Sequence, residues 1–118
     1  MPPGKRERAR TERQLIRALT EACETAKCEI QGFTWLTHIA DPDALAETLT
    51  VIWVFETLED SKLAQREAKA RIVELTAMAL DKANLHLALS DRNVRFDSEQ
   101  ECQRSQSGDW RKRLGRGY

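Results

Sequence analysis

The stretch Leu49-Thr50-Val51-Ile52-Trp53-Val54-Phe55 is the longest apolar run in this 118-residue chain. Alternate side chains of a strand point to opposite faces, so Trp53 shares one face with Leu49, Val51 and Phe55, and the residues between them share the other. Strands that are apolar on both faces are typical of the middle of a sheet. We therefore predict a central strand from Thr48 to Glu56, with the Trp53 face under helices.

A second strand is predicted just before it, over Phe33–Ile39. Strict alternation would place Phe33, Trp35, Thr37 and Ile39 on one face, and Thr34, Leu36 and His38 on the other. Asp41-Pro42-Asp43 is a sequence typical of turns. The connection that ends at Glu47 is longer than the loop of a tight hairpin. A connection of this length predicts adjacent, antiparallel strands.

One helix is predicted before this strand pair in the sequence, and another after it. From about Arg6 to Cys28, apolar residues recur with helical spacing at Leu15, Leu19, Ala22 and Ala26. Almost nothing apolar precedes Leu15, so the first two turns should project or fray. A second helix is predicted from Thr57, which has a capping-box spacing to Asp60, to about Asn84.

The remainder of the chain predicts short elements. Leu85–Leu89 fits either a short strand or the frayed end of the second helix, and Asn93–Phe96 fits a strand with Val94 and Phe96 inward. Ser98 and Glu101 are spaced as the cap of a short last helix, and Trp110–Leu114 fits one more turn. The predicted order is α-β-β-α-β-α. We expect an α+β fold in two layers, with the helices on one face of a small antiparallel or mixed sheet.

Length and composition predict one domain over residues 1–118, with loose ends at about 1–5 and 115–118. The chain is 41% hydrophobic and 32% charged, which suits a small globular domain. It has no secretory signal and no run long enough for a membrane span. The three cysteines, Cys23, Cys28 and Cys102, are an odd number, which is typical of reduced thiols in a cytoplasm. We expect a cytoplasmic protein.

The formal net charge is zero, but the two ends are basic and the middle is acidic. A basic segment at either end of a chain can contact the phosphates of a nucleic acid. Residues 6–17 carry arginines spaced four, three and four apart, so they share one helix face. The candidate nucleic-acid-binding residues are Arg6, Arg10, Arg13, Arg17, Arg111, Lys112 and Arg113. Solvated tails without a partner are the alternative.

The sequence gives little sign of a metal site or a catalytic site. Cys23 and Cys28 lie about 140° apart around a helix, which does not favour a shared metal. Neither histidine, His38 or His86, has a ligand at a useful spacing, and no glycine-rich phosphate loop or nucleophile elbow occurs. We expect no catalytic residue, no metal and no small-molecule cofactor. A metal-dependent nuclease using the carboxylates Asp41, Asp43 and Glu56 is a less favoured alternative.

Four segments spread over most of the chain carry a resemblance: 23–27, 32–38, 49–55 and 96–110. Through them the chain resembles a family of small bacterial proteins that are often labelled Fis-type transcriptional regulators. In element order it also resembles ribosome-binding factor A, a type II KH-like domain. Asp41–Leu45 and Val94–Ser98 sit where that family has similar segments. The second resemblance implies binding to RNA or to the ribosome.

These observations predict a small non-enzymatic protein that binds nucleic acid, in association with RNA or the ribosome. Trp35 and Trp110 fit either stacking platforms for bases or core residues. The alternative is a protein-interaction module or homodimeric regulator without catalytic activity. It rests on the second sheet face, with Thr34 and Leu36 beside Ile52 and Val54, which needs a cover.

Overall fold

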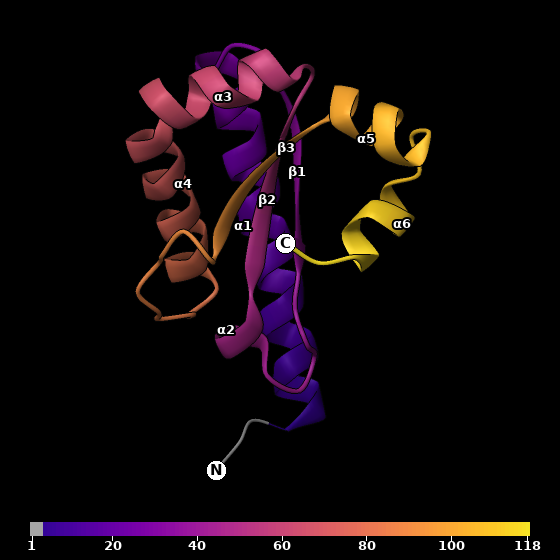
Figure 1. Ribbon diagram of the computed structural model, residues 1–118. Helices are drawn as coiled ribbons and strands as arrows, with labels where there is room; N and C mark the ends of the chain where they lie inside the picture. Colours follow the sequence, from indigo (N-terminus) through magenta and orange to yellow (C-terminus); the bar gives the residue numbers. More distant parts are fainter. Residues whose placement is uncertain (1–3) are drawn as a thin grey trace.

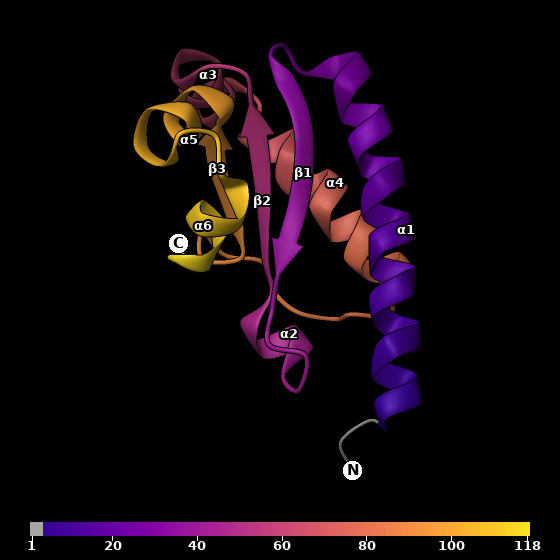
Figure 2. The same ribbon diagram turned by 90° about the vertical axis from the view of Figure 1, so that its right-hand side faces the viewer.

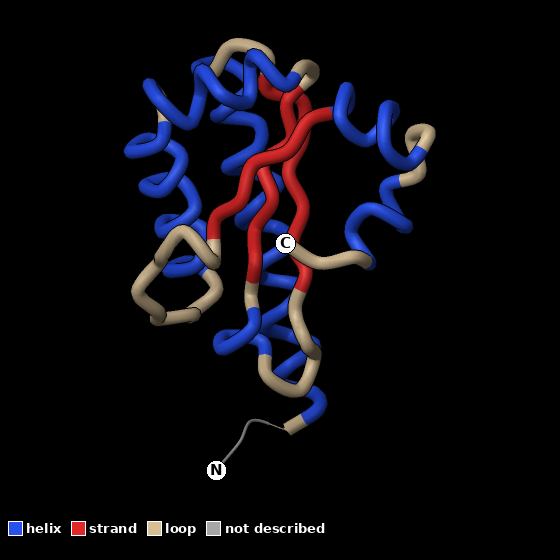
Figure 3. The backbone as a smooth tube through the Cα atoms, viewed as in Figure 1, coloured by secondary structure: helices blue, strands red, loops and turns tan. Residues whose placement is uncertain are grey.

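The computed structural model describes residues 4–118 and confirms the α+β class. The nine elements that it describes run in the order helix, strand, helix, strand, helix, helix, strand, helix, helix. They are α1 (Lys5–Glu29), β1 (Phe33–Ile39), α2 (Leu45–Thr48), β2 (Thr50–Phe55), α3 (Leu58–Glu67), α4 (Lys69–Lys82), β3 (Val94–Ser98), α5 (Glu99–Gln106) and α6 (Trp110–Gly115). Figures 1 and 3 show the sheet upright in the middle, with helices around it.

The central position predicted for the apolar run is confirmed. The strand order is β1-β2-β3, with β1 antiparallel and β3 parallel to β2. The side chains from Val51 to Phe55 are fully buried. The antiparallel pairing of β1 with β2 also agrees with the sequence.

The helices lie on both faces of the sheet rather than on one. Figure 2 views the sheet edge-on, with α1 and α4 on one side and α5 and α6 on the other. The main core holds Trp53, Phe55 and Phe33 together with the apolar faces of α1 and α4. Ile52 and Val54 point to the other face and are fully buried as well. The chain's own last helices, α5 and α6, thus cover the sheet face that was expected to need a partner. This removes the support that the exposed face gave to a dimer.

The predicted division of β1 between the two faces is wrong, because the strand contains a bulge. Phe33 pairs with Phe55, but Trp35 pairs with Val54, so the register shifts at Thr34. One extra residue in a strand reverses the alternation that follows it. Leu36 and His38 therefore join Phe33 on the α1 side, whereas Trp35 points toward α6.

The predicted second helix is two helices. The chain breaks at Ala68, whose φ of −120° and ψ of 6° are not helical, and this residue both ends α3 and precedes α4. The break lets α3 pack on β3 and α5 while α4 packs along α1. No glycine or proline marks this joint in the sequence, so the residue pattern favoured one long helix. The predicted cap is confirmed, since Thr57 Oγ1 accepts from the Asp60 amide at 3.0 Å.

Two connections and the C-terminal segment differ from the expected pattern. The link between β1 and β2 contains one helical turn, α2. Residues 85–89 form neither a strand nor a helix, although Leu85, Leu87 and Leu89 pack on the core. At the C-terminus, Tyr118 bonds to Asp97, so residues 115–118 are held on the body rather than loose. The expected loose start is described only from residue 4, and Lys5 already belongs to α1.

Candidate functional site

The four arginines predicted on α1 do lie along one side of a single helix. Arg6, Arg10, Arg13 and Arg17 are all exposed, and three of them line one shallow hollow on the helix surface. Their span is eleven residues, or about 16 Å. The start of α1 extends beyond the sheet in Figures 1 and 2. Among residues 4–118, no ion pair is found for any of these four guanidinium groups.

The three basic residues predicted on the last helix do not act together. Arg111 and Lys112 are exposed on α6, but Arg113 is buried. Its Nε and Nη2 donate to the two carboxylate oxygens of Asp97 at 2.7 and 2.8 Å, and its Nη1 donates to Gln106 at 2.8 Å. With its donors occupied inside the protein, Arg113 is not a residue that we assign to a phosphate contact.

The two basic ends also do not converge. Helices α1 and α6 lie on opposite sides of the sheet in Figure 2. A single nucleic-acid surface therefore cannot include both sets without wrapping around the molecule. The structure brings together Arg6, Arg10, Arg13 and Arg17, and it separates them from Arg111 and Lys112.

Asp97 is the centre of a buried polar cluster that the sequence did not reveal. Besides Arg113, the Tyr118 hydroxyl donates to its Oδ2 and the Ser98 amide donates to its Oδ1. Burial alone would raise the pKa of Asp97, but these hydrogen bonds outweigh it and lower the pKa below its usual value. Through these contacts the cluster holds α6 and Tyr118 against β3.

Glu99, two residues further on, joins two tryptophans. Its Oε1 accepts from Trp35 Nε1 at 2.6 Å, and its Oε2 accepts from Trp110 Nε1 at 2.9 Å. The two indole rings meet edge to face, with centroids 4.9 Å apart. Trp53 bonds to Thr76 in the main core. Trp53 is fully buried and so cannot stack on a base, whereas the partly buried Trp35 and Trp110 are held against each other through Glu99.

The alternative nuclease carboxylates are separated by the length of the sheet. Asp41 and Asp43 follow β1, whereas Glu56 follows β2 at the opposite end of the antiparallel pair. Six strand residues span about 20 Å. In the described part of the chain, no group of three His, Cys, Asp or Glu side chains is placed to hold a metal ion. These carboxylates therefore do not form one metal site.

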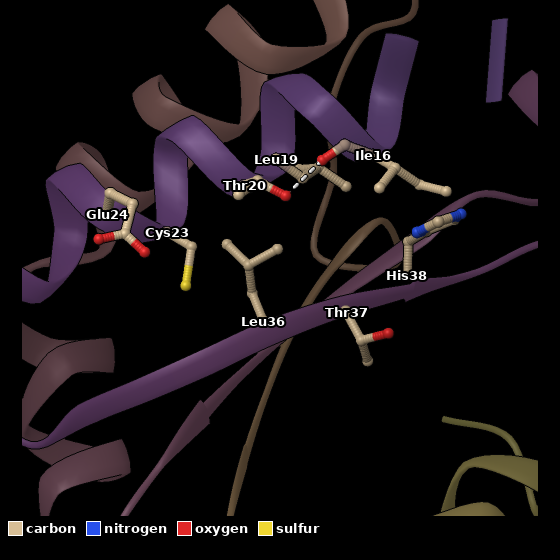
Figure 4. A pocket seen from close by; sticks show the side chains of 8 residues that line it. All are labelled: Ile16, Leu19, Thr20, Cys23, Glu24, Leu36, Thr37 and His38. Carbon is tan, nitrogen blue, oxygen red and sulfur yellow. Dashed lines mark hydrogen bonds between the residues drawn. The ribbon is translucent and has the colours of Figure 1, made fainter. Parts of the chain in front are cut away.

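A groove runs between α1 and the outer edge of β1. Ile16, Leu19 and Leu36 form its apolar part, and Cys23 and His38 border it (Figure 4). Burial lowers the pKa of His38, and Glu12, whose Oε1 lies 4.0 Å from His38 Nε2, partly opposes this. The sequence missed the groove because strict alternation turned Leu36 and His38 to the other face. The bulge at Thr34 creates it.

None of the described helices is both long and apolar enough to cross a membrane. Comparisons with protein-family models, with curated proteins and with solved structures give no match for this chain.

Proposed function

We propose that this protein binds RNA, free or within the ribosome, through the exposed arginine side of α1, and that it does so without catalysis. The observation that carries the proposal is the row formed by Arg6, Arg10, Arg13 and Arg17. The four guanidinium groups form no ion pair with the described residues 4–118, and they lie on a helix that extends beyond the body, where they can meet phosphates. Arg111 and Lys112 lie on the opposite side of the sheet and are left out of the proposed contact.

The resemblance to ribosome-binding factor A favours RNA over DNA. The described order, with two helices between β2 and β3, is compatible with a KH-like arrangement. The chain has no Gly-x-x-Gly sequence, the loop with which KH domains clamp a nucleic-acid backbone. For this reason we assign the contact to the arginines of α1 rather than to the joint between α3 and α4.

An electrostatic contact of this kind predicts a defined salt dependence. Each phosphate that is neutralised releases condensed counterions, so four contacts to a single strand give a slope of log K against log salt of about −3. The variant R6Q/R10Q/R13Q/R17Q removes four charges from one side of α1. Its affinity for RNA at low salt should fall steeply, and the remaining slope should be near zero.

The chain offers a charge-matched control. Lys62, Arg66, Arg92 and Arg95 are also exposed, and they lie around α3 and β3 instead of on α1. The variant K62Q/R66Q/R92Q/R95Q has the same net charge as the α1 variant, so a general charge effect would weaken both equally. Fluorescence anisotropy with a labelled RNA at two salt concentrations distinguishes them. No binding by the wild-type chain at low salt, or equal losses in the two variants, would contradict the proposal.

A further inference from the structure

The outer edge of β1 is an open pairing edge. Among the described strands, β1 borders only β2, and Figure 2 looks toward its free edge. Val51 N–H donates to Asn93 O at 2.7 Å, so the odd-numbered residues of β2 turn their main-chain groups toward β3. The even-numbered ones turn toward β1, where they face Trp35, Thr37 and Ile39. The main-chain groups of Leu36 and His38 therefore point outward.

Apart from the bulge at Thr34, this edge lacks the features that usually keep edge strands from pairing. Phe33–Ile39 contains no proline and no Asp, Glu, Lys or Arg. The other edge strand, β3, differs, since it carries the exposed Arg95 and the inward-pointing Asp97 and packs against α3. The bulge at Thr34 disturbs only the first part of β1 and leaves the straight part free to pair.

The groove beside this edge adds an apolar surface. It has a volume of about 310 Å³ and is lined by Ile16, Leu19 and Leu36. Ile16 is 48% exposed, which makes it one of the two large apolar side chains that stand out from the described surface. Figure 4 shows the side chains of Leu36 and Cys23 under α1, with Ile16 at the other end of the groove. A strand added to β1 would need a helix to cover this groove.

We propose that a second copy of this chain supplies both the added strand and the covering helix. The result is a two-fold dimer in which the two β1 strands pair antiparallel across an axis at Thr37. In that register, Leu36 exchanges main-chain hydrogen bonds with His38 of the second copy, and His38 with Leu36. The two Thr37 side chains meet at the axis, and Trp35 lies opposite Ile39, a favourable aromatic–aliphatic pair. No like charges meet across the strands.

Charge complementarity along α1 points to the same partner. Arg13 and Glu24 are eleven residues apart, three helical turns, so both lie on one side of α1. The segment between them runs beside Thr37, because Glu12 reaches His38 and the side chains of Leu19 and Cys23 lie by Leu36. The two-fold axis therefore brings Arg13 of each copy to Glu24 of the other, so that in the dimer Arg6, Arg10 and Arg17 remain for the proposed phosphate contact. Glu24 Oε1 also lies 3.9 Å from Lys27 Nζ of its own helix. In the dimer the Glu24 carboxylate is therefore shared between Lys27 of its own chain and Arg13 of the other.

Sedimentation velocity of the full chain, over a range of concentrations and without RNA, tests the dimer. Ile16→Glu places a charge at the groove and should weaken dimerisation about tenfold or more. Met78→Glu is the matched control, because Met78 is also 48% exposed but lies on α4. It should leave the dimer unchanged. A wild-type chain that stays monomeric at about 0.5 mM overturns the proposal, and so does an equal loss in both variants.

A charge exchange gives the decisive comparison. Arg13→Glu and Glu24→Arg should each weaken the dimer, by about fivefold, and the double variant R13E/E24R should restore it. Within one chain the two residues are about 16 Å apart, so a structural effect inside the monomer would not be rescued. Additive losses in the double variant contradict this interface.

Amide hydrogen exchange provides a second readout. The amides of Leu36 and His38 point outward in a monomer and are hydrogen-bonded in the proposed dimer. Their exchange should slow as protein concentration rises, while that of Thr37, which pairs with β2, should change little. Exchange at Leu36 and His38 that does not depend on concentration overturns the proposed pairing.

Discussion

Asp97 and Arg113 form a bidentate ion pair inside the protein. Arg113 Nε lies 2.7 Å from Asp97 Oδ2, and Arg113 Nη2 lies 2.8 Å from Asp97 Oδ1. Asp97 belongs to β3 and Arg113 to α6, so the pair holds the last helix on the second face of the sheet. The side chains are almost fully buried. Taking either charge away leaves the other in a medium where an unpaired charge is costly.

We predict that Asp97→Asn lowers the free energy of unfolding by about 3 kcal/mol, because it leaves the buried guanidinium without a countercharge. Urea denaturation followed by circular dichroism measures this. Arg104→Gln is the control, since Arg104 pairs with Glu101 on the surface, where such pairs contribute about 0–1 kcal/mol. Similar losses in both variants would mean that the buried pair has no special role.

The same pair predicts an acid-dependent part of stability. The pKa of Asp97 is lower in the folded protein than in the unfolded chain, where it is about 3.9. Its stabilising contribution is therefore complete above the unfolded value and is lost as the pH falls through the lower folded value. The difference in unfolding free energy between wild type and Asp97→Asn should be constant from about pH 7 to pH 5 and shrink below about pH 4. A difference that does not shrink would contradict the assignment.

Tyr118 predicts the opposite dependence at alkaline pH. Burial, and then the hydrogen bond to Asp97, raise the pKa of its hydroxyl above the ordinary value of about 10. Its contribution is present below the unfolded pKa and is lost as the pH rises toward the folded one. Wild type should exceed Tyr118→Phe in stability near pH 8, and this advantage should decrease above about pH 10. Chemical denaturation at several pH values checks it.

The fold was largely predictable because the strongest signals are local. The apolar run of β2 and the caps Thr57 and Ser98 each carry their own evidence in a few adjacent residues. The bulge at Thr34 and the break at Ala68 do not, since no glycine or proline marks either. The break at Ala68 accompanies packing against segments far away in the chain, as α3 meets β3 and α5.

The candidate site could be predicted only in part, for the same reason. The spacing of the arginines on α1 is a property of one helix, so the sequence reveals it. The burial of Arg113 depends on Asp97, sixteen residues earlier, and on the coverage of the second sheet face by α5 and α6. A run of basic residues at 111–113 looks uniformly exposed until that packing is known.

Glu99 should act as a link between two indoles. Glu99→Leu removes both acceptors and leaves the N–H groups of Trp35 and Trp110 without partners, which we expect to cost about 2–3 kcal/mol. Tryptophan fluorescence and near-ultraviolet circular dichroism should change, because the geometry of the edge-to-face pair depends on this link. Glu59→Leu, on the exposed first turn of α3, should stay within about 0.5 kcal/mol of wild type. An unchanged spectrum in Glu99→Leu would contradict the predicted role.

Gly32 turns the chain from α1 into β1, and we predict that only glycine fits there. Its φ is +76°, and a Cβ at this position would lie 2.3 Å from the Asp60 carboxyl carbon. Gly32→Ala therefore combines backbone strain with a steric overlap, and it should lower the free energy of unfolding by about 2 kcal/mol or more. Thermal and urea denaturation measure the loss.

Gly115 is the matched control for that substitution. It lies in α6, its φ is not positive, and an added Cβ would meet no atom within 4 Å. Alanine loses less conformational freedom than glycine on entering a helix, so Gly115→Ala should stabilise the protein by about 0.5–1 kcal/mol. Opposite signs for the same chemical change would show that the turn at Gly32 requires the left-handed conformation. Equal effects at the two positions would mean that α1 and β1 can meet through another turn, with Asp60 free to move aside.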